Sequence, residues 1–140
     1  MKKLIYIFNI LLLIGCTTES ADQVKENEII KANRVVVLEF DTTEPNFDEI
    51  RISYFDYKTN TYPIVIHEFE YDSSGEAIPF ILKFEKYNFR YINGVGYRNN
   101  PSTAELSVKL YVDDVLVLED ADRGRNGEYA EISFDYDAGF

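Results

Sequence analysis

Apolar and polar residues alternate along much of the chain after residue 33, and this period of two constrains the fold more than any other feature of the sequence. Successive side chains of a β-strand point to opposite faces of a sheet, so the pattern predicts strands with one buried and one solvated face. It is clearest over residues 104–112, where the apolar positions are Leu106, Val108, Leu110 and Val112. Asp113 and Asp114 then lead directly into a second apolar run, which predicts a two-residue hairpin.

Similar runs of β-branched and aromatic residues, separated by turn residues, recur through the rest of this region. The sequence also predicts a turn at Asn93 and Gly94, because both residues tolerate a positive φ angle. The further predicted strands cover residues 34–41, 49–56, 62–71, 78–86, 115–118 and 128–137.

About seven to eight short strands without helical crossovers predict an all-β fold, an immunoglobulin-like antiparallel β-sandwich over residues 33–140. A small closed barrel is the competing architecture. The chain has no tryptophan and a single cysteine, so it lacks the buried tryptophan and the disulfide that mark antibody domains. Its core must therefore be held by aromatic and aliphatic packing alone.

The first 16 residues have the layout of a secretory signal. Two lysines precede an apolar run over residues 4–14, which Gly15 and Cys16 follow at once. As a helix, this run would reach about 17 Å, which is short of the roughly 30 Å that a membrane span requires. The pattern resembles the lipobox of bacterial lipoproteins, which implies a signal peptide over residues 1–15 and lipidation of Cys16. The alternatives are an ordinary signal peptide with an incidental cysteine, or an uncleaved anchor.

Residues 16–32 are predominantly polar and are predicted to form a flexible tether between the lipidated Cys16 and the sandwich. A flexible segment of this length typically spans about 20 to 25 Å. An aspartate after the cysteine would resemble the inner-membrane retention signal of enterobacterial lipoproteins. Thr17 stands there instead, so the resemblance to lipoproteins implies the outer membrane. We therefore expect a cell-envelope protein that contacts the membrane through its lipid anchor, with an envelope protein or a glycan as a candidate partner.

The formal charge of -11 argues against nucleic acid as a partner, because nucleic-acid binding depends on neutralising phosphates. Catalysis is also not expected. His67 is the only histidine and lies within a predicted strand, where we expect its ring to pack among aromatic side chains. No nucleophile, phosphate-loop or zinc signature accompanies it, so the sequence predicts neither an enzyme nor a cofactor.

Acidic side chains near the C-terminus are candidate calcium ligands, because calcium is bound by six to eight oxygen ligands. No EF-hand register fits this segment, and Arg123 and Arg125 lie inside the cluster and would oppose a cation. We therefore expect a solvated, internally paired acidic loop, with calcium binding as the alternative. The candidate ligands are Asp120, Asp122, Asn126 and Glu128.

The chain contains 11 tyrosines and 10 phenylalanines, more aromatic residues than one sheet face needs. Tyrosines at loop ends suit sugar or peptide contact, because the ring packs while the hydroxyl stays hydrated. Aromatic pairs that only stabilise the sheets are the alternative explanation. The candidate ligand-binding residues are Tyr57, Tyr97, Arg98 and Asn99.

The segments 52–54, 88–100 and 104–134 together resemble the MmpS family of mycobacterial small membrane proteins and its exported β-sandwich relatives. The likeness centres on the hairpin over residues 109–117, in which Asp114 stands where the family usually has glycine. The resemblance implies a non-enzymatic extracytoplasmic sandwich and, in that family, an accessory role in lipid export. The family carries a transmembrane helix and usually a cysteine pair, whereas this chain has a lipobox and one cysteine.

Together these features predict a membrane-anchored extracytoplasmic lipoprotein whose sandwich has a non-catalytic binding, scaffolding or envelope-accessory role. A glycan- or calcium-binding module and an accessory subunit of a lipid transporter are the alternative functions.

Overall fold

The computed structural model describes residues 33–43, 49–125 and 127–139. The predictions for the signal peptide, Cys16, the tether and Asn126 lie outside these residues. Within them, no helix is long and apolar enough to cross a membrane. The strands are β1 (Arg34–Thr42), β2 (Glu49–Tyr54), β3 (Ile64–Glu68), β4 (Glu70–Tyr71), β5 (Ala77–Ile78), β6 (Phe80–Tyr87), β7 (Tyr91–Arg98), β8 (Glu105–Val112), β9 (Val115–Arg123) and β10 (Glu131–Asp137).

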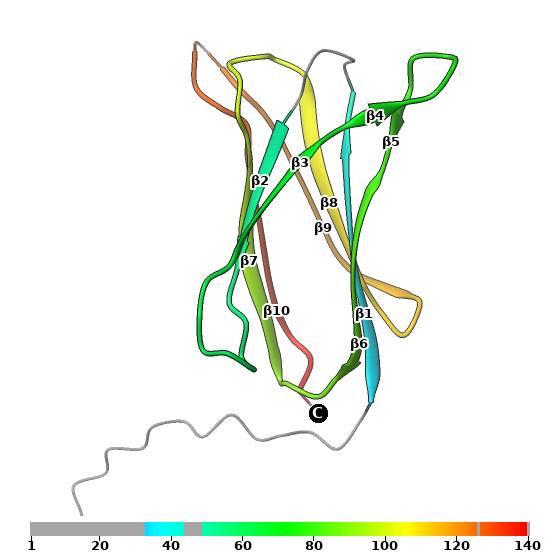
Figure 1. Cartoon of the computed structure of the whole chain (residues 1–140), viewed down its shortest axis with the longest axis vertical. Helices are drawn as coiled ribbons and strands as arrows, with labels where there is room; N and C mark the ends of the chain where they lie inside the picture. The colour runs from blue at the N-terminus through cyan, green and yellow to red at the C-terminus, as the bar shows by residue number, and fades with distance from the viewer. Residues whose placement is uncertain (1–32, 44–48, 126, 140) are drawn as a thin grey trace, which may run out of the picture.

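Two four-stranded antiparallel sheets pack face to face (Figure 1), which confirms the predicted β-sandwich. The strand order is β6-β1-β8-β9 in the first sheet and β10-β7-β2-β3 in the second. The short hairpin β4-β5 forms a separate two-stranded sheet where the chain passes from the second sheet to the first. We call the end where β1 begins and β6 ends the lower end, as drawn in Figure 1, and the opposite end the upper end.

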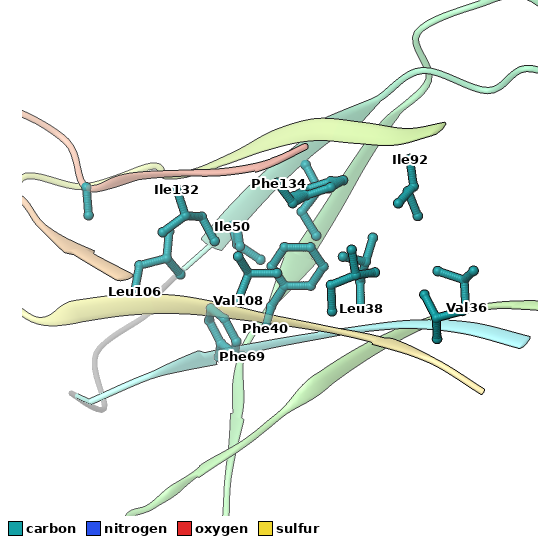
Figure 2. Close-up of a cluster of buried hydrophobic side chains, with 14 residues drawn as sticks. Val36, Leu38, Phe40, Ile50, Phe69, Ile92, Leu106, Val108, Ile132 and Phe134 are labelled. Carbon is teal, nitrogen blue, oxygen red and sulfur yellow. The ribbon is translucent and has the colours of Figure 1, made fainter. Parts of the chain in front are cut away.

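The core lies between the sheets and is built from the inward positions of both (Figure 2). All four apolar positions predicted to face inward along β8 are buried, because β8 pairs on both sides and only alternate side chains reach the opposite sheet. Phe40 of β1 meets Phe134 of β10 across the interior, with their ring centroids 6.1 Å apart. Aromatic and aliphatic packing therefore forms the core, as the composition predicts.

The predicted hairpin at Asp113 and Asp114 is confirmed. Their φ angles are 50° and 65°, the positive values that a tight two-residue turn of this twist requires and that aspartate tolerates. Asp113 also joins the turn to β1, since its Oδ1 accepts a hydrogen bond from the backbone N–H of Val35 at 2.9 Å.

The predicted turn at Asn93 and Gly94 is wrong, because both residues lie inside β7. Gly94 is required there for close packing and not for a turn. A Cβ atom on Gly94 would lie 2.4 Å from Cζ of Phe134 and 2.5 Å from the carbonyl oxygen of Ser53. The chain turns earlier, over residues 88–90, before β7 begins.

Several predicted strand boundaries also differ from the structure, and two of these differences change the description of the sheets. The segment 62–71 divides into β3 and β4 at Phe69, whose side chain is 7% exposed and packs against the core instead of continuing the alternation. The strand predicted over 115–118 extends to Arg123, because β9 pairs with β8 along its whole length.

Candidate functional site

A cleft of about 710 Å³ lies at the lower end of the sandwich. Its walls come from the end of β2, the turn after it, the second half of β6 and the connection from β6 to β7. This volume falls within the range of about 300 to 1,000 Å³ that is typical of small-molecule sites. The lining residues are Tyr54, Phe55, Asp56, Lys58, Lys83, Phe84, Glu85, Lys86, Tyr87, Asn88, Phe89 and Ile92.

A continuous chain of seven aromatic rings forms the apolar part of this end and supplies five of the lining residues. Their separations suit the offset and edge-to-face contacts that aromatic rings prefer, so each ring fixes the next. The successive pairs are Tyr62–Phe55 at 4.9 Å, Phe55–Tyr57 at 4.6 Å, Tyr57–Phe89 at 5.5 Å, Phe89–Tyr87 at 5.4 Å, Tyr87–Phe84 at 6.0 Å and Phe84–Tyr54 at 5.3 Å between centroids.

An irregularity in β6 places two of these rings on the same side of the strand. Val36 pairs with Phe84 and Arg34 pairs with Tyr87, so β6 advances three residues while β1 advances two. The extra residue is a β-bulge, which shifts the alternation by one position. Phe84 and Tyr87 therefore both line the cleft, and Lys86 within the bulge takes a φ angle of 56°.

The turn after β2 is held by Asp56, whose side chain caps it. Asp56 Oδ1 accepts a hydrogen bond from the N–H of Lys58 at 2.9 Å, and its Oδ2 accepts one from Thr59 Oγ1 at 2.8 Å. The hydrogen bond from Thr59 lowers the pKa of Asp56 below its ordinary value, so this carboxylate stays ionised at neutral pH.

The tyrosine hydroxyls at the lower end stay protonated at neutral pH. Burial raises the pKa of Tyr54, Tyr57 and Tyr87 above the ordinary value of 10.0. Tyr87 donates its hydroxyl hydrogen bond to the backbone carbonyl of Tyr91 at 2.5 Å. These hydroxyls therefore carry no charge, and the proton of the Tyr87 hydroxyl is already donated within the fold.

The charged residues of the cleft are three lysines and two carboxylates. Lys83 pairs with Glu85 at 3.1 Å, and Asp56 is engaged by its own turn. Lys86 makes no ion pair with any residue that the structure describes. The cleft therefore carries a local excess of positive charge in a chain whose formal charge is -11.

The structure does not bring the four predicted ligand-binding residues together. Tyr57 lies at the lower end, where it packs on the cleft-lining rings of Phe55 and Phe89. Tyr97, Arg98 and Asn99 lie at the end of β7 that pairs with the start of β2, at the upper end. The length of β7 separates the two groups by roughly 20 Å, at about 3.3 Å per residue.

Arg98 serves the fold instead of facing a ligand in solution. It is the last residue of β7 and is 1% exposed, although the sequence predicts a residue that contacts a ligand. Its Nη1 donates a hydrogen bond to the carbonyl of Ala104 at 2.7 Å, and its Nη2 donates one to Thr42 Oγ1. A buried guanidinium needs such partners, and here they tie β7 to β1 and to the chain before β8.

Asn99 and Tyr97 contact the beginning of β2. Asn99 Nδ2 donates a hydrogen bond to Glu49 Oε1 at 3.0 Å, and the backbone N–H of Asn99 donates to the carbonyl of Glu49 at 2.8 Å. Tyr97 lies opposite Arg51 and is hydrogen bonded to its guanidinium. Asn99 is exposed and Tyr97 is half-buried, and their contact with a ligand stays a prediction.

Two of the calcium candidates are hydrogen bonded to backbone amides of the neighbouring sheet. Asp120 Oδ2 accepts from the N–H of Ser133 at 2.8 Å, and Asp122 Oδ2 accepts from the N–H of Glu131 at 3.0 Å. Both carboxylates of β9 thus join the first sheet to β10 of the second. Glu128 is exposed, and no group of three or more histidine, cysteine or acidic residues in the described part of the chain could hold a metal ion.

The prediction that His67 packs among aromatic rings is confirmed. Its ring is stacked on Phe80, with centroids 3.9 Å apart and an interplanar angle of 14°, and it meets Phe69 edge-on at 5.8 Å. Burial lowers the pKa of His67 below 6.5, and the nearby carboxylates of Glu70 and Glu68 oppose this shift.

We expect His67 to make the protein less stable below about pH 6.5. As the pH falls through 6.5 towards the lower pKa of the folded state, the unfolded chain takes up the proton first, so stability is lost. His67→Phe should therefore lose less thermal stability than the wild type between pH 7.5 and pH 5.5, measured as Tm by circular dichroism. Equal losses in both proteins would show that His67 does not contribute, since all carboxylates are common to the two.

The sequence contains a signal for part of the cleft. Aromatic residues are dense over residues 54–62 and again over 84–91, and the packing of the two sheets brings these segments to the same end. No sequence signal indicates the role of Lys86, because it depends on the pairing between β6 and β1.

The cleft combines aromatic surface, protonated hydroxyls and ammonium groups, a set of groups suited to noncovalent binding. No protein-family model matches the sequence, and no curated protein matches it significantly.

Proposed function

We propose that this protein is an exported lipoprotein, anchored through Cys16, whose sandwich binds a ligand in the cleft at its lower end without changing it chemically. The cleft carries this proposal, because its volume, its aromatic lining and its charged groups are those of a small-molecule site. We infer a position in the cell envelope, at the outer membrane, from the signal sequence, the lipobox and Thr17.

The position of the cleft agrees with such an anchor. Arg34, the first residue of β1, pairs with Tyr87 of the cleft wall, so the chain enters the sandwich beside the cleft. Attachment through Cys16 would hold this end of the domain nearer to the membrane than the upper end.

Two measurements test the proposal. In bacteria, radiolabelled palmitate should be incorporated into the wild-type protein and not into Cys16→Ser. If the wild-type protein incorporated no label, the lipid anchor would be contradicted. A thermal-shift panel of oligosaccharides and short peptides should contain a ligand that stabilises the wild type. Phe89→Ala should abolish most of that stabilisation, because it removes a lining ring.

The matched control for this panel is Tyr129→Ala. Tyr129 is 55% exposed and does not line the cleft, so its removal should leave the ligand response unchanged. Binding in the cleft would be contradicted if no compound of the panel stabilised the wild type. It would also be contradicted if the ligand stabilised Phe89→Ala as much as it stabilises the wild type. Co-purification with a membrane transporter would instead favour the accessory role that the family resemblance implies.

A further inference from the structure

Lys86 occupies a backbone conformation that a lysine adopts only at a cost. Four described non-glycine residues have positive φ angles, and three of them are asparagine or aspartate, which adopt this region readily: Asn60, Asp113 and Asp114. Lys86, at 56°, is the exception. Strained backbone of this kind is concentrated at functional sites, so the question is what the lysine side chain provides there.

Its charge is not used by the fold. Glu85, the neighbouring carboxylate, pairs with Lys83 at 3.1 Å, and Asp56 is hydrogen bonded within its own turn. Lys86 lines the cleft, is exposed, and forms no ion pair within the described part of the chain. An ammonium group in this position is available to a ligand that carries a carboxylate or a similar anion.

The rest of the cleft lining indicates which kind of anion fits. Six of the twelve lining side chains are polar and not aromatic. A purely apolar ligand, such as a hydrocarbon chain, would remove the water that hydrogen bonds to these side chains and would offer no hydrogen bonds in its place. Five of the lining residues are aromatic, and the electron-rich face of an aromatic ring attracts the weakly positive C–H groups of a sugar ring. A saccharide satisfies both requirements, because it has hydroxyl groups at its edges and C–H groups on its faces.

We propose that the cleft binds an acidic saccharide, with the sugar ring on the aromatic lining and its carboxylate on the ammonium group of Lys86. This rests on the proposed function, since it names the ligand class of the same cleft. Lys58, at the opposite wall, is a second cation that the saccharide can reach, although it also lies near Asp56.

The test compares matched acidic and neutral sugars by isothermal titration calorimetry: trigalacturonate with galactotriose, and 3′-sialyllactose with lactose. The wild type should bind at least one acidic sugar about tenfold or more tightly than its neutral counterpart. Lys86→Gly should bind the acidic sugar about tenfold more weakly and leave the neutral sugar unaffected.

The same variant also excludes misfolding as an explanation. Glycine adopts a positive φ angle without strain, so Lys86→Gly should keep or raise the Tm of the wild type while it loses the acidic sugar. The matched charge control is Lys109→Gln, which removes a lysine on the outer face of the first sheet, paired with Glu39 at 3.6 Å. It should bind both sugars as the wild type does.

Each outcome decides between the two proposals. If neutral and acidic sugars bind equally, and Phe89→Ala weakens both, the cleft binds saccharides but the role of Lys86 is wrong. If only peptides bind and Phe89→Ala weakens them, the saccharide proposal fails and the binding function stands. If the protein binds vesicles of anionic phospholipid through Lys86 and binds no sugar, the saccharide proposal also fails. If no sugar, peptide or vesicle binds, both proposals fail.

Discussion

Gly94→Val should destabilise the protein by about 3 kcal/mol or more, which is a large fraction of the roughly 5 to 15 kcal/mol by which a folded domain is usually stable. The valine side chain has no space in the middle of β7, because even its Cβ would lie 2.4 Å from Cζ of Phe134 and 2.5 Å from the backbone oxygen of Ser53. The Ser53 carbonyl belongs to β2, which pairs with β7, so relief would require moving a whole strand. The change is measured as the free energy of unfolding in urea.

The control for this variant is Gly75→Ala. Gly75 lies in the turn between β4 and β5 with a φ angle of 86°, and no atom lies within 4 Å of a Cβ built on it. Its substitution should cost about 1 kcal/mol from backbone strain alone. If Gly94→Val were no less stable than Gly75→Ala, the close approach of Phe134 to β7 would be wrong.

Phe40→Ala should cost about 3 to 5 kcal/mol. Phe40 is fully buried at the middle of the core (Figure 2). The centroid of its ring lies 6.4 Å from that of Phe80 in the same sheet and 6.1 Å from that of Phe134 in the opposite sheet. Truncation therefore leaves a cavity between the two sheets and removes aromatic contacts on both sides. Urea unfolding followed by tyrosine fluorescence and by circular dichroism should give the same reduced midpoint.

Tyr129→Ala provides the comparison for this loss, since an exposed substitution should change stability by less than about 0.5 kcal/mol. A Phe40→Ala variant that unfolds at the same urea concentration as Tyr129→Ala would show that the core is not centred on Phe40.

Features that depend on neighbouring residues in the sequence were predictable. The inward positions of β8 follow from alternation, the hairpin at Asp113 and Asp114 follows from turn chemistry, and the packing of His67 follows from its apolar neighbours. The alternation and the hairpin each need only a few consecutive residues. For His67 the strand pattern indicates an aromatic environment, whereas its stacking partner, Phe80, comes from the other sheet.

Features that depend on distant residues were not predictable. Asn93 and Gly94 carry the signal of a turn, but β7 pairs with both β2 and β10, and Phe134, the partner of Gly94 in β10, lies 40 positions further along the chain. Arg98 has a polar side chain typical of a loop, but Thr42 and Ala104 supply buried acceptors for it. The cleft likewise depends on the register between β1 and β6, which no single segment specifies.

The hydrogen bonds from β10 to Asp120 and Asp122 have a consequence for self-association. An exposed strand edge can recruit an extended segment of another molecule and so begin aggregation. Here two amides at that margin of the second sheet are already occupied by carboxylates of β9. An extended segment of another molecule would have to displace the carboxylates of Asp120 and Asp122 before it could pair with β10. These hydrogen bonds therefore hinder fibre growth at this edge of the second sheet.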